Sequence, residues 1–290
     1  MGKRLRKLVV IVLLLAAVLP AAAQRQDFLG RGELVLCGGG MSYIGDLNNQ
    51  SAFGMPRLGF GVGLRERLDN RWSLRLNASV GSVGCDHDYL ELRNLSFRSD
   101  VYELSAVAEF NFRPYGPGGT ESQWTPYLFG GIGVFRFNPM ASYTNSEGAV
   151  EWVELQPLCT EGQGTQAYPE RRQYSRLQLC MPFGMGVRFR LGKSVSVAAE
   201  YGFRKTWTDY LDDVSTTYVG AELLGSAVAD GDMAARMADR SGEVVAGYVN
   251  APGIKRGDDS LDDWYSFFNL SIGFSLETLF GWMRNTRCEM

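Results

Sequence analysis

Apolar and polar side chains alternate along most of the chain with a period of two residues. Between Leu177 and Leu191 every odd-numbered residue is large and apolar, whereas the even-numbered residues are mostly small or polar, with Arg188 and Arg190 near the end. This is the period of a β-strand with one apolar and one polar face. Including two less regular segments, the pattern predicts eight strands, over residues 34–44, 57–65, 71–80, 102–113, 127–137, 177–191, 194–204 and 268–277.

Glycines interrupt two of the predicted strands. Gly38, Gly39 and Gly40 lie in the first strand, and Gly130 and Gly131 lie in the fifth. Glycine inside a strand often marks a bulge, and a bulge changes the face on which the following side chains emerge. We therefore expect bulges in both strands.

A barrel of such strands either keeps its apolar face inside, as soluble lipocalin-like barrels do, or turns it toward lipid. The polar face here is rich in Gly, Ser and Arg rather than Lys, which favours a narrow lumen crowded with ion pairs. Most predicted strands reach about 10 residues, the length of a tilted membrane span. Aromatic residues gather near the strand ends, as they do at the two interfaces of a bilayer. Those of one rim are Trp72, Phe110, Phe112, Tyr127 and Phe189, and those of the other are Phe137, Phe203, Trp207 and Tyr265. The sequence therefore predicts an all-β fold, an eight-stranded antiparallel transmembrane β-barrel of the outer membrane.

The connections between the predicted strands alternate in length. The short ones, residues 69–70, 114–124 and 192–193, follow even-numbered strands. The long ones follow odd-numbered strands and cover residues 46–55, 84–98, 138–173 and 208–263. Bacterial outer-membrane barrels have short periplasmic turns and long extracellular loops. The alternation therefore predicts a barrel whose N-terminal strand starts in the periplasm.

The first 23 residues have the pattern of an export signal. Four cations, Lys3, Arg4, Arg6 and Lys7, precede an uncharged apolar run over residues 8–19 and the small residues 21–23. The apolar run is too short for a transmembrane anchor, which needs roughly 20 residues, and the small residues mark a cleavage site. We expect cleavage between Ala23 and Gln24. The predicted domains are then a signal peptide, 1–23, and the barrel, 24–290.

The charge of the chain excludes one class of partner. The formal net charge is −3, and it becomes −7 when the four cations of the signal are removed. An acidic chain of this kind is a poor candidate for binding nucleic acid.

The chain has five cysteines, Cys37, Cys85, Cys159, Cys180 and Cys288. An odd number leaves at least one thiol unpaired, and so this is no disulfide scaffold. Cys85 and Cys159 fall in neighbouring predicted surface loops and are candidates for a disulfide, which only geometry decides.

Charged residues recur on the polar face of the predicted strands. Because the interior of an eight-stranded barrel is just wide enough for side chains to fill it, we expect these charges to pair with one another rather than to line a channel. They are Arg57, Arg65, Arg75, Glu103, Glu109, Arg188, Glu200 and Arg204.

The predicted last surface loop, 209–263, is strongly acidic, with twelve acidic and four basic residues. Asp209, Asp212 and Asp213 are weak candidates for a Ca²⁺ or Mg²⁺ site because these ions take oxygen ligands. The spacing is not that of an EF-hand, and a solvated acidic loop is the favoured interpretation; we expect no cofactor. Residues 219–237 have a helix-forming composition, interrupted by Gly225 and Gly231, and predict a short helix.

His87 is the only histidine and follows Asp86 in a predicted surface loop. A surface histidine with a carboxylate and a serine is the arrangement of an acyl-transfer site. No G-x-S-x-G signature accompanies it, and a lone loop histidine is usually solvated.

Six segments together resemble the PorG-like outer-membrane barrel family of Bacteroidota. They are GGGMSYIGDLN (38–48), RNLSFRSDVYELSAVAEFNF (93–112), TPYLFGGIGVFRFNP (125–139), WVELQPLCTEGQGT (152–165), RKTWTDYLDDVSTTY (204–218) and DDWYSFFNLSIGF (262–274). The resemblance covers essentially the whole chain after the signal, and TDYLDDVSTTY is its most specific string. It implies a component of the type IX secretion system, a machine that exports proteins across the outer membrane. It also implies that the barrel contacts a periplasmic ring formed by a lipoprotein and its partner, and is not itself the translocation pore.

Three hypotheses of function follow. The first is a non-enzymatic barrel that sits among outer-membrane lipids and anchors or stabilises the periplasmic ring through its turns and C-terminal tail, 279–290. The second is a barrel whose surface loops bind an external ligand or divalent cations. The third is a lipid-modifying enzyme that uses His87.

Overall fold

The computed structural model describes residues 30–48, 54–86, 88–116 and 121–280. The predicted cleavage site at Ala23 and Gln24, His87, Cys288 and most of the predicted periplasmic tail lie outside the described residues. Among the residues that it describes, no helix is long and apolar enough to cross a membrane.

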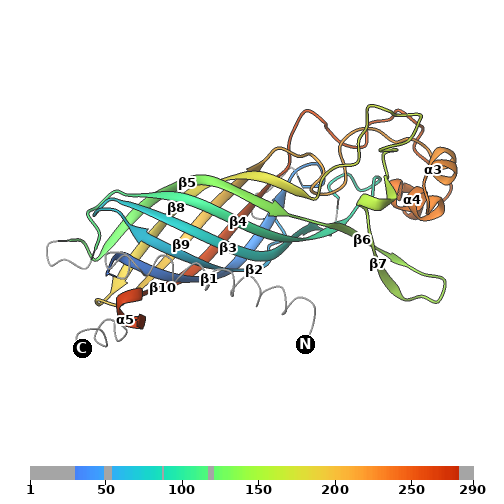
Figure 1. The fold of residues 1–290 in the computed structure, drawn as a ribbon. Helices are drawn as coiled ribbons and strands as arrows, with labels where there is room; N and C mark the ends of the chain where they lie inside the picture. Colours follow the sequence, from blue (N-terminus) through green and yellow to red (C-terminus); the bar gives the residue numbers. More distant parts are fainter. Residues whose placement is uncertain (1–29, 49–53, 87, 117–120, 281–290) are drawn as a thin grey trace, which may run out of the picture.

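Eight antiparallel strands form a closed barrel, as predicted (Figure 1). Each strand pairs with its neighbours in sequence, and the first pairs with the last, so that no edge remains open. They are β1 (Gly32–Ile44), β2 (Arg57–Arg67), β3 (Trp72–Cys85), β4 (Phe97–Asn111), β5 (Trp124–Arg136), β8 (Leu177–Leu191), β9 (Val195–Thr206) and β10 (Trp264–Ser275). The last strand therefore begins four residues earlier than predicted, and the short helix α5 (Leu276–Phe280) follows it.

The apolar face of the barrel is outside. Leu58 is 73% exposed and Ile132 is 74% exposed, and many other leucines and phenylalanines of the strands are exposed in the same way. The alternate positions, such as Arg188 and Glu109, are buried in the lumen. A soluble lipocalin-like barrel has the reverse arrangement, and so the structure excludes that alternative.

The predicted aromatic rims are partly wrong. Trp72, Phe112, Phe189 and Trp207 are exposed on the outside, as expected of side chains at a membrane interface. Three other residues assigned to the rims, Tyr127, Phe137 and Tyr265, are buried and face inward.

The predicted bulges are absent. The register of β1 with β10 and of β5 with β8 is constant from end to end. Instead, the glycines allow neighbouring strands to approach one another closely. A Cβ atom at Gly39 would lie 1.9 Å from the carbonyl oxygen of Phe268, and one at Gly131 would lie 2.0 Å from that of Ala106. Any larger residue would push these strands apart.

The two ends of the barrel differ in the length of their connections (Figure 1). The short turns, the start of β1 and the end of β10 lie at one end of the barrel, and the long loops lie at the other. The third long loop contains a hairpin, β6 (Pro139–Thr144) and β7 (Val150–Glu154), and the turn η1 (Gln156–Leu158). The hairpin was not predicted; β6 extends the sheet by pairing with the start of β4. The fourth contains α3 (Ala221–Ala227), α4 (Gly231–Ala238) and η2 (Ser241–Glu243). The helix predicted over 219–237 is thus two helices.

The long loops pack together over the mouth of the barrel. Their buried side chains, among them Leu158, Leu211 and Met237, form one hydrophobic cluster with Tyr43 and Phe135 of the strands. The barrel at this end is therefore covered by an ordered loop assembly, which we call the loop cap (88–96, 137–176 and 207–263).

Candidate functional site

A cluster of buried charges fills the middle of the lumen. Glu109 of β4 is fully buried, and its carboxylate forms ion pairs with three arginines: Arg65 Nε at 2.9 Å, Arg75 Nε at 3.0 Å and Arg188 Nη2 at 2.6 Å. Arg75 continues the network to Glu200, at 2.7 Å. Because every carboxylate faces a guanidinium, the charges remain compatible with burial.

A second ion pair lies nearer the loop cap. Arg204 Nε donates to Glu103 at 3.0 Å, and the Tyr265 hydroxyl donates to the same carboxylate at 2.9 Å. Seven of the eight predicted lumen residues therefore pair with one another or with a neighbour in the lumen. Arg57 is the exception, because it pairs with Asp86 at the start of a surface loop. The lumen is filled by these side chains, as expected of an eight-stranded barrel.

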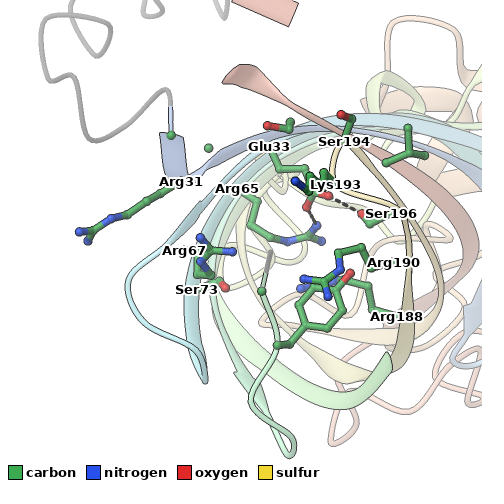
Figure 2. A pocket seen from close by; sticks show the side chains of 16 residues that line it. Arg31, Glu33, Arg65, Arg67, Ser73, Arg188, Arg190, Lys193, Ser194 and Ser196 are labelled. Atoms are coloured by element: carbon green, nitrogen blue, oxygen red, sulfur yellow. Dashed lines mark hydrogen bonds and ion pairs between the residues drawn. The ribbon is translucent and has the colours of Figure 1, made fainter. Parts of the chain in front are cut away.

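A small basic pocket lies at the short-turn end of the lumen (Figure 2). Its volume is about 80 Å³, and its lining includes Arg65, Arg188, Arg190 and the carboxylate of Glu33. Figure 2 shows the arginine side chains of β2 and β8 pointing toward one another across the pocket, with Glu33 joined to Arg65 and Ser196. We call this site the basic mouth.

Tyr115, from the link between β4 and β5, packs into the basic mouth. Its ring lies 5.6 Å from the guanidinium of Arg188 and 5.9 Å from that of Arg190. Its backbone N–H donates to the carbonyl of Asn70 in the neighbouring turn at 2.8 Å. The turns of this end therefore hold one aromatic side chain against the bottom of the lumen.

In the loop cap, Glu161 joins two segments far apart in the sequence. Its carboxylate is fully buried and accepts from the backbone N–H groups of Ser215 and Thr216, both at 2.9 Å. Arg256 Nη1 donates to it at 2.8 Å. Glu161 lies in the TEGQGT string and Ser215 in the TDYLDDVSTTY string, so that the two motifs form one buried site.

Four of the twelve acidic residues of the last loop, Asp209, Asp212, Asp213 and Asp263, are buried, contrary to the favoured interpretation of a solvated loop, whereas others such as Glu222 and Asp259 are exposed. The Tyr43 hydroxyl lies 2.5 Å from Asp212 Oδ2 and 2.9 Å from Asp263 Oδ1. Burial raises the pKa of Asp212 to about 8 and that of Asp209 to about 9, and it raises the pKa of Asp263 well above its usual range. These carboxyls are therefore protonated over part of the neutral range, which allows burial without a cation.

The candidate metal ligands do not converge. Asp213 accepts from Thr160 at 2.5 Å and from Tyr174 at 2.7 Å, whereas Asp212 faces Tyr43. Burial raises the pKa of Asp213 to about 6, and Arg256 opposes that rise. In the part of the chain that the structure describes, no group of three or more His, Cys, Asp or Glu side chains is arranged to hold a metal ion. The structure therefore does not bring Asp209, Asp212 and Asp213 together as a metal site.

The candidate disulfide between Cys85 and Cys159 does not form. Among the described residues no disulfide joins Cys37, Cys85, Cys159 or Cys180. Cys85 is buried, with its Sγ 3.4 Å from the Leu47 carbonyl, and Cys159 lies beside Gln156 and Gln173. Different loops thus surround the two thiols.

Several residues of these sites were not identified in the sequence. Glu161 lies outside the acidic loop 209–263, and nothing in the string TEGQGT marks it as buried. Tyr115 stands in the link between two strands, where alternation carries no signal. Arg190 was read only as part of a polar face.

A closed antiparallel barrel with an apolar exterior, a lumen of paired charges and short turns at one end defines a class of protein. The chain is an integral β-barrel of the outer membrane. The short-turn end with the basic mouth is the periplasmic end of such a barrel, and the loop cap faces the outside. A family model described as "Domain of unknown function (DUF6089)" matches residues 6–151, half of the chain, and the chain belongs to this family. No curated protein sequence matches it significantly.

Solved outer-membrane barrels are similar at low sequence identity. Neisserial surface protein A matches 84% of this chain and 96% of its own, with 10% identity and a TM-score of 0.40. Ail, the attachment invasion locus protein of Yersinia pestis, was solved with the heparin analogue sucrose octasulfate. It matches over 84% and 97% of the two chains, with 11% identity and a TM-score of 0.39. The outer membrane enzyme PagL matches over 83% and 98%, with 13% identity and a TM-score of 0.33. These likenesses concern overall fold and carry no argument about function.

Proposed function

We propose that the protein is a non-enzymatic outer-membrane anchor that stabilises the periplasmic ring of a type IX secretion machine. The observation that carries this proposal is the difference between the two ends of a filled barrel. Paired charges occupy the lumen around Glu109, and the loop cap covers the outer mouth. The periplasmic end presents the basic mouth, whose rim residues Arg67, Arg190 and Lys193 suit docking of an acidic surface of another protein.

The resemblance of six segments to the PorG-like family supports the identity of the partner. That resemblance implies a ring of a periplasmic lipoprotein and its companion. Two of its strings meet at Glu161, which holds the backbone of residues 215–216. Two of the strings that carry the resemblance therefore form one buried contact in the loop cap.

A pull-down from native outer membranes tests the proposal. The affinity tag is placed in the turn 145–149 of the β6–β7 hairpin, far from the periplasmic end, and the full-length barrel is cross-linked before solubilisation. We expect a periplasmic lipoprotein of the ring to co-purify. A matched variant that lacks residues 222–239, and with them α3 and α4, should recover the same lipoprotein. Recovery of no periplasmic lipoprotein or ring component from either protein would overturn the proposal.

A second candidate function, binding of a surface ligand, is favoured by a groove beside the loop cap. The groove has a volume of about 750 Å³ and is lined on its barrel side by Phe183, Phe203 and Trp264. Lys255 and Asp258 line its loop side. This combination suits an amphiphilic molecule of the outer leaflet. Lys255→Glu should then abolish ligand binding by whole cells and leave protein secretion unchanged.

The enzymatic hypothesis remains a prediction because His87 lies outside the described residues. A lipid-modifying activity in the purified protein that His87→Ala abolishes would establish it.

A further inference from the structure

The basic mouth contains more positive than negative charge. Six cationic residues line it, although the side chain of Arg31 points away from the cavity (Figure 2), and Glu33 is the one carboxylate among the described residues that line it. The cationic residues are Arg31, Arg65, Arg67, Arg188, Arg190 and Lys193. Glu109 lies deeper in the lumen and receives Arg65 and Arg188. The pocket therefore combines a cavity with a charge that its own acids do not neutralise.

The excess positive charge comes from three side chains at the rim that have no carboxylate partner in the described part of the chain. Arg65 is paired with Glu33 and Glu109, and Arg188 with Glu109. Arg67, Arg190 and Lys193 form no ion pair with any carboxylate of the described residues. Arg67 and Arg190 are half-buried and Lys193 is exposed, so that solvent screens part of their mutual repulsion, and an anion between them would lower it further.

Three residues that line the cavity also carry unpartnered hydrogen-bond donors. Arg188 Nε, Arg190 Nη1 and the Tyr115 hydroxyl are buried and form no hydrogen bond. Arg188 as a whole is only 1% exposed. Both guanidinium groups lie against the ring of Tyr115. Buried polar groups of native proteins are nearly always hydrogen-bonded, so that several orphaned donors at one pocket indicate a missing acceptor.

These observations define the chemistry of that acceptor. Guanidinium and phenol donors match the oxygens of a carboxylate or phosphate group. The cavity volume is only about 80 Å³. We therefore expect it to take a single oxyanion group rather than a whole nucleotide. The pocket lies inside the rim of the barrel, whereas lipid headgroups surround the outside.

We propose that the basic mouth is an oxyanion-binding site, which takes a carboxylate or phosphate group entering from the periplasm. Arg67, Arg190 and Tyr115 hold the anion, and Arg65 and Arg188 supply the positive field behind it. The site stands independently of the proposed role in secretion, because it follows from the charges and cavity of this chain alone.

Titration calorimetry on the purified full-length barrel in neutral detergent tests the site. The probes are inorganic phosphate and, separately, a hexaglutamate peptide. We expect binding of at least one probe to the wild type and a loss of about tenfold or more in affinity in the double variant R67Q/R190Q. Binding of phosphate alone identifies a free anion as the ligand, and tighter binding of the peptide identifies carboxylates of a protein partner. Both results support the site.

The double variant R57Q/R98Q is the matched control. It removes the same charge at the opposite end of the barrel, where Arg57 and Arg98 pair with Asp86 and Asp100. It should bind the probes as the wild type does. Because Arg67 and Arg190 have no carboxylate partner, R67Q/R190Q should unfold at the same or a higher temperature than the wild type in the absence of probe. Equal binding by the wild type and R67Q/R190Q, or no binding of either probe by the wild type, would overturn the proposal. So would an equal loss in R57Q/R98Q.

Discussion

The lumen and the loop cap bury carboxylates in opposite ways. In the lumen, Glu109 forms ion pairs with three arginines. In the loop cap, Asp212 and Asp263 share the hydroxyl of Tyr43. Burial raises the pKa of both aspartates, so that a bound proton, rather than a paired arginine, neutralises their charge.

The two regions should therefore respond to different perturbations: the lumen to substitution of its side chains, and the loop cap to pH. The ion pairs of the lumen depend on which side chains are present, and they resist changes of pH in the neutral range. The aspartates of the loop cap depend on the proton concentration. One molecule thus combines a barrel held by fixed charges with a cover held by titratable ones.

The largest expected effect comes from breaking the network of the lumen. Glu109→Gln leaves three buried arginines without their shared carboxylate. The free energy of unfolding should fall by about 3–5 kcal/mol, measured by urea unfolding in detergent micelles. Glu154→Gln is the control, because the pair of Glu154 with Arg176 is largely exposed and should contribute less than about 1 kcal/mol. Similar losses in both variants would contradict the ranking.

The next effect is a change of pH, which should act on the loop cap alone. The folded-state pKa of Asp212, about 8, lies above the unfolded value of about 3.9. The folded loops therefore hold its proton more tightly, and their stability is complete below about pH 4 and declines as the pH rises toward 8. The decline is at most about 1.4 kcal/mol per pH unit for each such group. Hydrogen-exchange protection of the Leu211 and Val214 amides, which donate to Asp263 and Asp212, measures it.

The matched variant D212N/D263N keeps both side chains neutral at every pH. After correction for intrinsic exchange rates, protection of its Leu211 and Val214 amides should change little between pH 5 and 8.5. Protection in the strands β1 and β10 should change little in either protein. A wild-type loop cap that is equally protected at both pH values would show that these aspartates are not protonated in the folded protein.

A smaller effect is expected at the junction of the two motifs. Glu161→Gln weakens a charge-assisted bond to Arg256 and removes one of the acceptors of residues 215–216. We expect a loss of about 2 kcal/mol in local stability, detected as faster proteolysis of the last loop while the barrel stays folded. Glu147→Gln, on the exposed hairpin turn, should leave the cleavage rate unchanged. A global loss of the barrel in E161Q would mean that cap and barrel unfold together.

The smallest effect concerns the thiols. Because no disulfide joins Cys85 and Cys159, substitution of the half-buried Cys159 by serine should shift the free energy of unfolding by less than about 0.5 kcal/mol. Dithiothreitol should leave the melting temperature of the barrel unchanged. A lower melting temperature on reduction would show a disulfide that joins the loops.

The barrel itself was predictable because its physics is local and periodic. Lipid on one side and a polar lumen on the other impose the alternation of residues 177–191, and each strand carries the same information independently. The lumen ion pairs followed from the same face assignment. Arg57 departed from the rule because it stands at the end of its strand, where a loop residue, Asp86, reaches it.

The loop cap was not predictable because its contacts join distant segments. Tyr43 contacts Asp212, which lies 169 residues further along the chain, and no spacing in the sequence predicts this contact. Counting acidic residues suggested a solvated loop, but the count carries no information about burial. The glycines of β1 and β5 show a related difficulty: bulges and close strand contacts both favour glycine, and only the register separates the two causes.

The seam of the barrel has a consequence for how the chain folds. Glu33 pairs with Ser275, so that the first and last strands of the barrel close it together. Closure therefore brings together residues separated by nearly the whole chain, a high-contact-order step that is slow in comparison with forming the hairpins between neighbours. A chain emerging in order must complete all its hairpins before its seam can form, and until then β1 and β10 present unpaired edges. The period between export and closure is when this protein most needs protection from aggregation.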